Sequence, residues 1–197
     1  MPGWILSTLP PWLVVNFNWL VVAAGVVALL VCAFYAIGRL AFPSLWRRRS
    51  QKRRIRSARH VIDTLRSFEH DAQRFAYLRK IDPFVFEELI LEAFERRQFK
   101  IQRGVRYTGD GGIDGQFWSR HGDLYLIQAK RYSCHISAQH VRDFSKLVSM
   151  RKCKGVFVHT GRTGSMARTL AKENPAISII SGKRLLKLLE PLEQQAA

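Results

Sequence analysis

The sequence is poor in the residues that build disulfide scaffolds and zinc sites. It has three cysteines, Cys32, Cys134 and Cys153, an odd number without a closely spaced pair. This excludes a disulfide framework and favours a reducing compartment. None of the three has a second ligand at the spacing that zinc sites use, which argues against a structural zinc ion.

Acidic residues are also scarce. The chain has 15 Asp and Glu against 32 Lys and Arg, a formal net charge of +17. Residues 1–80 hold 13 basic and 3 acidic residues, and residues 81–197 hold 19 and 12. The excess is thus shared between an N-terminal part and the remainder, and both parts are expected to meet anionic partners.

Charge is absent from residues 1–38, and residues 19–38 are mostly Val, Ala and Leu. This length suits a single transmembrane helix, so we predict residues 1–46 to be a tail and a membrane anchor. A cleaved signal peptide and a buried core helix are less favoured, the first because its positive start is missing. The basic residues from Arg39 to Arg59 predict an inner-membrane protein with its N-terminus outside and its body in the cytoplasm. For this basic cluster, binding of lipid is favoured over contact with DNA.

Residues 47–80 are predicted to be a basic, helical linker. Residues 54–80 contain no Gly or Pro, and apolar residues recur at heptad spacing. One interpretation is a stalk that forms a homodimer; the other, slightly favoured because three weak heptads make a poor zipper, is an amphipathic helix packed on its own domain. Asp82 and Pro83 predict the start of a new helix, so the third domain covers residues 81–197.

The third domain alternates helical and strand patterns. Helices are expected at 83–98, 137–151, 164–174 and 182–190, and strands at 99–107, 112–119, 123–130, 155–160 and 177–181. A glycine-rich turn at residues 108–112 separates the first two strands. This order predicts an α/β domain.

Three polar residues of the second and third strands form a candidate catalytic set. Gln128 and Lys130 are two apart on a strand and point to one face, and hairpin pairing can bring Asp114 beside them. The oxygens of Asp114 and Gln128 suit a hard divalent cation, Mg²⁺ or alternatively Mn²⁺, while Lys130 can position a water. Each residue also has an ordinary reading, as a turn aspartate or an edge-strand lysine.

Residues 86–89, 109–115 and 125–132 resemble, in order and spacing, the catalytic domain of Mrr-like restriction endonucleases of the PD-(D/E)xK superfamily, and the likeness continues through residues 141–144 and 155–161. The resemblance implies a three-layer core with a central mixed sheet flanked by helices. It implies Asp114 and Gln128 as metal ligands, Lys130 as the catalytic lysine and Glu87 as the helix glutamate, with Glu88 as the alternative. In place of the family's usual N-terminal DNA-recognition domain stands the predicted membrane helix.

Several basic residues near this set are candidate DNA contacts. They are Arg131, Arg142, Lys146 and Arg162. The sequence thus predicts a membrane-anchored, metal-dependent endonuclease that cleaves double-stranded DNA in the restriction or processing of foreign DNA. The alternatives are a non-catalytic DNA-binding membrane protein with a nuclease-like fold, and a nuclease for RNA or DNA junctions.

Overall fold

The computed structural model describes residues 11–104 and 112–190, and for residues 11–18, 20 and 36–48 only the backbone. The chain divides into two compact units, Met1–Gln51 and Lys52–Ala197. Helix α1 (Pro11–Arg66) begins in the first unit and ends in the second. The predicted turn at 108–112 and the end of the predicted strand 99–107 lie mostly outside the described residues.

The first unit carries apolar side chains without a protein core around them. Ten large apolar side chains between Trp19 and Tyr35 are more than half exposed. Among the described residues, however, no helix has a stretch long and apolar enough to span a membrane. The predicted span over residues 19–38 is therefore not supported by the structure.

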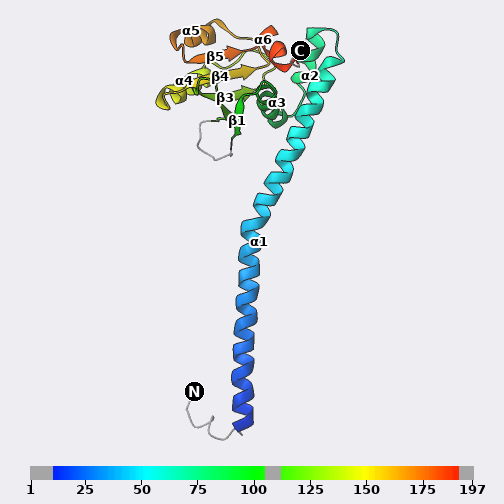
Figure 1. The fold of residues 1–197 in the computed structure, drawn as a ribbon, viewed down its shortest axis with the longest axis vertical. Helices are drawn as coiled ribbons and strands as arrows, with labels where there is room; N and C mark the ends of the chain where they lie inside the picture. The colour runs from blue at the N-terminus through cyan, green and yellow to red at the C-terminus, as the bar shows by residue number, and fades with distance from the viewer. Residues whose placement is uncertain (1–10, 105–111, 191–197) are drawn as a thin grey trace. The chain divides into compact units, whose positions relative to one another are not determined.

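The second unit is built on a five-stranded sheet in the order β1–β2–β3–β4–β5 (Figure 1). Strands β1 (Lys100–Arg103), β2 (Gly115–Trp118) and β3 (Leu124–Lys130) pair antiparallel. Strands β4 (Lys154–His159) and β5 (Ile177–Ile180) continue from β3 in parallel. The sheet is therefore mixed, as predicted.

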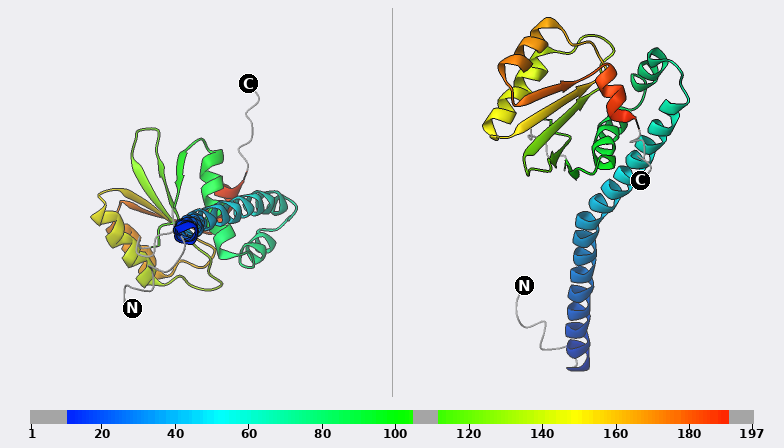
Figure 2. Two further views of the ribbon diagram at one scale, coloured as in Figure 1. Left: turned by 90° about the horizontal axis from the view of Figure 1, so that it is seen from below. Right: turned by 45° about the horizontal axis from the view of Figure 1, so that its top comes forward.

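Helices cover both faces of this sheet (Figure 2). Helices α4 (Ala138–Met150) and α5 (Ser165–Glu173) pack with Leu126 and Phe157 on one face. Helices α3 (Pro83–Arg96) and α6 (Lys183–Leu189) pack with Ile127 and Val156 on the other. Because alternate strand residues point to opposite faces, two apolar clusters form. The predicted α/β core with flanking helices is confirmed.

Helix α3 begins as predicted. The Asp82 carboxylate accepts hydrogen bonds from the backbone N–H groups of Phe84, at 2.8 Å, and Val85, at 3.2 Å. Pro83 occupies the first turn, where no N–H is needed. This cap fixes the helix that covers β1 and β3.

The connecting segment packs on its own domain, which confirms the favoured interpretation for its first half. Ala58, Ile62 and Leu65 are buried in the same core as α3. The expected continuous helix over 54–80 is wrong, because α1 ends at Arg66 and α2 (Asp71–Leu78) begins anew. The Arg74 guanidinium donates to the carbonyls of Leu65, at 3.3 Å, and Phe68, at 2.9 Å, and so satisfies backbone groups at the break.

Candidate active site

Asp114 lies where β2 meets the middle of β3. Its N–H donates to the Ile127 carbonyl at 3.0 Å, and its carbonyl accepts from Gly104 N–H at 2.9 Å. Its Oδ2 accepts the backbone N–H of Ala129 at 2.7 Å. The carboxylate is thus fastened to the residue that stands between Gln128 and Lys130.

Gln128 is held by a hydrogen bond to Gly112, two residues before Asp114. Its side chain is 5% exposed, and Nε2 donates to the Gly112 carbonyl at 2.9 Å. Gly112 has a φ of +77°, and a Cβ there would lie 2.8 Å from Gln128 Nε2. Glycine fits this position because its backbone adopts a positive φ without strain. Any other residue would also bring its Cβ too close to the Gln128 amide.

Lys130 ends β3 and lies on the same face as Gln128, two residues along the strand. Its partner on β4 is His159. His159 is fully buried, and its Nε2 is 3.1 Å from Thr163 Oγ1. Burial lowers the pKa of His159 to about 4, so the ring is neutral at physiological pH and adds no charge beside the lysine.

The loops that follow β3 and β4 are joined next to Lys130. Thr160 Oγ1 donates to the Tyr132 carbonyl at 2.8 Å and accepts from its N–H at 2.9 Å. Arg162 N–H donates to the Cys134 carbonyl at 2.9 Å, and the Arg162 carbonyl accepts from Ile136 N–H at 3.1 Å. These bonds hold the backbone around two of the predicted DNA-binding residues, Arg131 and Arg162, both exposed.

The other two predicted DNA-binding residues lie one turn apart on α4. Arg142 is half-buried, and its Nε donates to Gln139 Oε1 at 3.2 Å. Lys146 is exposed. Arg131, on the loop after β3, donates to the Arg79 carbonyl, which restrains its side chain. Contact of these four residues with DNA stays a prediction.

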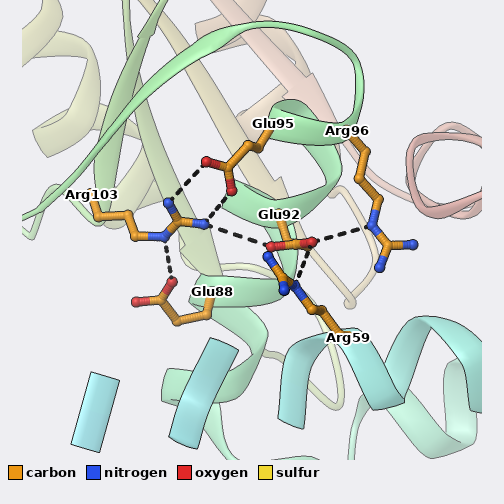
Figure 3. A network of polar contacts seen from close by, with 6 residues as sticks. All are labelled: Arg59, Glu88, Glu92, Glu95, Arg96 and Arg103. Atoms are coloured by element: carbon orange, nitrogen blue, oxygen red, sulfur yellow. Dashed lines mark hydrogen bonds and ion pairs between the residues drawn. The ribbon is translucent and has the colours of Figure 1, made fainter. Parts of the chain in front are cut away.

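The acidic face of α3 is bound to arginines (Figure 3). Arg103, at the end of β1, donates through Nε to Glu88 at 3.1 Å and through Nη2 to Glu95 at 2.6 Å. Glu92 is 2.9 Å from Arg59 and 3.3 Å from Arg96. Burial raises the pKa of Glu88, while the Arg103 guanidinium opposes this shift.

This network bears on the choice between the two helix glutamates. Glu88 is engaged by Arg103 on the α3 side of the sheet, whereas Gln128 and Lys130 share the face of Leu126, which packs with α4. Glu87 is half-buried, and its place in the site stays a prediction. Helical spacing of Glu88, Glu92 and Glu95 is the sequence pattern that indicates this network.

The donor chemistry of Asp114 and Gln128 fits a hard divalent cation. Within residues 11–104 and 112–190, no group of three or more His, Cys, Asp or Glu side chains could hold a metal ion. Mg²⁺, however, commonly keeps several waters and takes one or two carboxylates together with substrate phosphates. The carboxylate of Asp114 and the amide oxygen of Gln128 are ligand types that meet that smaller requirement.

Comparison with known proteins places these residues in a family. The Mrr_cat family model, described as a restriction endonuclease, matches residues 78–189, more than half of the chain. The type IV methyl-directed restriction enzyme EcoKMrr of Escherichia coli (strain K12) is 31% identical over 120 residues. That match covers 57% of this chain and 39% of the relative, so the chain spans about two fifths of the relative's length.

Two solved structures show a more distant likeness. A repair endonuclease from Pyrococcus abyssi has a TM-score of 0.39 at 15% identity, over 60% of this chain and 49% of the other. An EndoMS–dsDNA complex has a TM-score of 0.38 at 18% identity, over 54% and 44%. On the family match, which contains Asp114, Gln128 and Lys130, this chain belongs to the restriction endonuclease family of the Mrr catalytic domain.

Proposed function

We propose that this chain is an endonuclease that hydrolyses phosphodiester bonds of double-stranded DNA with a divalent metal, in the restriction or processing of foreign DNA. The observation that carries the proposal is the hydrogen bond from Ala129 N–H to the Asp114 carboxylate, which holds Asp114 against β3 between Gln128 and Lys130. All three residues lie within the stretch that matches the restriction endonuclease family. A relative that is named a restriction enzyme is in keeping with it.

Asp114 and Gln128 would hold the metal. The bond from Gln128 Nε2 to Gly112 sets the orientation of the amide, and the bond from Ala129 N–H to Asp114 Oδ2 sets that of the carboxylate. Ligands fixed in this way need little reorganisation when the cation binds. A bound divalent cation supplies charge neutralisation at the phosphate and lowers the pKa of water.

Lys130 acts on the attacking water and on the phosphate. Its ammonium offers three N–H donors, which can hold the water and offset the negative charge that grows on phosphorus. The water oxygen bonds to phosphorus, one P–O ester bond breaks, and the released oxygen takes up a proton. One strand thereby gains a phosphomonoester end and a hydroxyl end.

The test compares cleavage by the full-length chain and its Asp114→Ala variant on supercoiled plasmid, with and without Mg²⁺ or Mn²⁺. Metal-dependent nicking is expected, and Asp114→Ala should lower it by about a thousandfold. Asp123→Ala is the matched control, because Asp123 lies at the other end of the β2–β3 hairpin and pairs with Lys154 at 2.9 Å. It should cleave as the parent does.

Three outcomes would contradict the proposal. DNA binding without cleavage under any metal would favour the non-catalytic alternative. Preferential cleavage of RNA or of DNA junctions would show that double-stranded DNA is not the substrate. Equal loss of activity in Asp114→Ala and Asp123→Ala would remove the assignment of the metal site.

Attachment of the nuclease to a membrane is part of the proposal. It is supported by the uncharged residues 1–38, by the basic residues that follow them, and by the exposure of apolar side chains between Trp19 and Tyr35. Within the basic cluster, Arg59 binds Glu92 and Arg54 lies 4.5 Å from the Phe84 ring centroid. Arg53 and Arg56 are exposed and are the better candidates for lipid head groups.

A reporter fused after the last residue tests this attachment. The fusion should sediment with membranes, resist carbonate extraction and report a cytoplasmic position, whereas the same fusion lacking residues 1–38 should be released. Arg53→Gln with Arg56→Gln should weaken binding to anionic vesicles and leave the fold unchanged. A full-length fusion released by carbonate, or one reporting the opposite side, would contradict the membrane part alone.

A further inference from the structure

Strands β1 and β2 form a hairpin whose two faces differ in chemistry. On the α3 side, Phe117 is buried between Phe94 and Phe99, with ring centroids 4.6 Å and 5.0 Å away. Along both strands, buried or half-buried residues alternate with more exposed ones. One face therefore belongs to the core, and the other carries Lys100, Gln102, Gln116 and Trp118.

This second face, which we call the hairpin face, continues the candidate active site. Gln116 pairs with Leu126, and Leu126, Gln128 and Lys130 share one side of β3. Lys100 and Gln102 stand opposite Trp118 and Gln116 in the register of β1. Gln116 and Trp118 follow Asp114 by two and four residues, so the hairpin face starts at the proposed metal ligand.

The side chains of the hairpin face suit nucleic acid. The Gln116 amide donates to Gln102 Oε1 at 2.8 Å, and each amide keeps further donor or acceptor capacity. The Lys100 ammonium is 5.5 Å from the Trp118 ring centroid, which restrains it. In the described part of the chain Lys100 has no carboxylate partner, whereas the Arg103 charge on the opposite face is taken up by Glu88 and Glu95.

The spacing of side chains along one face of a strand also matches the base-pair spacing of B-DNA. Residues on one face of a strand repeat about every 6.6 Å. Two base-pair steps of B-DNA span about 6.8 Å along the helix axis. A duplex cut beside Asp114 and lying along β2 would therefore present new groups to Gln116 after about two steps and to Lys100 after about four.

We propose that the hairpin face is a DNA-contact surface, with Lys100 binding a backbone phosphate and the Gln102–Gln116 pair meeting base edges of the duplex. The proposal rests on the nuclease function above and adds where the substrate lies. Glutamine amides can bond adenine edges in two places, and a two-stranded ribbon fits the major groove. The hairpin face is thus expected to contribute sequence preference, and Lys100 affinity.

The test measures binding of a labelled duplex by the full-length chain in an Asp114→Ala background, where the DNA stays intact. Lys100→Gln should lower the slope of log affinity against log salt by about one, uniformly across sequences. Gln102→Ala with Gln116→Ala should lower affinity for preferred sequences about tenfold and flatten the preference. Lys154→Gln is the matched control, because Lys154 also lies 5.5 Å from an aromatic ring, that of Tyr125, but is paired with Asp123.

Cleavage by the same variants with Asp114 intact separates this inference from the proposed function. If the hairpin variants bind and cut DNA like the parent, or if Lys154→Gln loses as much affinity as Lys100→Gln, the hairpin face is overturned. If the hairpin variants lose affinity for RNA but keep their affinity for duplex DNA, the proposed role of the hairpin face is overturned as well. If they lose duplex affinity as expected while the parent never cleaves, the hairpin face stands and the nuclease function fails.

Discussion

The two faces of the β1–β2–β3 sheet both carry ionisable groups, and they use them differently. On the α3 face, Glu88, Glu92 and Glu95 meet arginines at ion-pair distance (Figure 3). On the other face, the Asp114 carboxylate accepts a hydrogen bond from the N–H of Ala129, the residue between Gln128 and Lys130 on β3. Arginine pairing joins charges within the fold on one face, whereas on the other face a backbone hydrogen bond sets the orientation of the Asp114 carboxylate.

The largest expected effect lies on the active-site face. Lys130→Ala should lower metal-dependent cleavage by about a thousandfold, because an electrostatic contact to the transition state is lost. Affinity for metal should be kept, since lysine is not a ligand. Single-turnover cleavage and Mn²⁺ binding measured on one preparation check this. Lys154→Ala removes a lysine at the start of β4, which is paired with Asp123, and should cleave normally. Equal losses of cleavage in both variants would contradict a specific role of Lys130.

Disrupting the ion pairs on the α3 face should lower the stability of the fold rather than the rate of cleavage. Arg103→Leu leaves Glu88 and Glu92 buried without their shared partner and should lower the free energy of unfolding by about 3 kcal/mol. Urea denaturation measures this. Arg103→Leu combined with Glu88→Gln should recover part of the loss, because one unpaired charge is removed. A stable single variant that has lost only cleavage would place Arg103 in the active site.

Neutral His159 beside Lys130 predicts a pH dependence. Its pKa is about 4 in the folded protein, below the ordinary value of 6.5, so the unfolded chain binds the extra proton. Stability should therefore fall as pH drops, by about 2 kcal/mol from this group between pH 7 and pH 5. His159→Asn should be less stable at pH 7 but lose less on acidification, and the exposed His121→Asn should keep the parent profile. Identical pH profiles of His159→Asn and the parent would contradict the buried, neutral ring.

The smallest expected effect is that of replacing Gly112, the glycine next to the Gln128 amide. Gly112 and Gly122 both have positive φ, but only at Gly112 would a Cβ meet Gln128 Nε2, while nothing lies within 4 Å of one at Gly122. Each change to alanine should cost about 1 kcal/mol from the backbone. Gly112→Ala should also weaken metal affinity, which isothermal titration with Mn²⁺ can measure. If both variants bind metal equally well, Gly112 does not orient the Gln128 amide.

Much of the fold could be predicted from the sequence because its signals are local. Helix α3 follows from Asp82, Pro83 and the apolar spacing after them, and the strands follow from apolar runs ended by turn residues. Local signals of the same kind also predict Asp114, Gln128 and Lys130 as the candidate set. Strand spacing puts the last two on one face, and a glycine-rich segment precedes the first.

Other features were decided by contacts between distant residues. The heptad pattern over 54–80 does not show that Arg74 closes the end of α1, and nothing near Gly112 in the sequence shows that it faces Gln128. The partners of Glu88, Glu92 and Glu95 come from α1 and β1 as well as α3. Sequence patterns report the conformation of neighbours along the chain, so they determine the elements. Pairing across the sheet depends on which elements pack together, and only the tertiary structure could decide which carboxylates meet arginines and which accepts a backbone N–H group of β3.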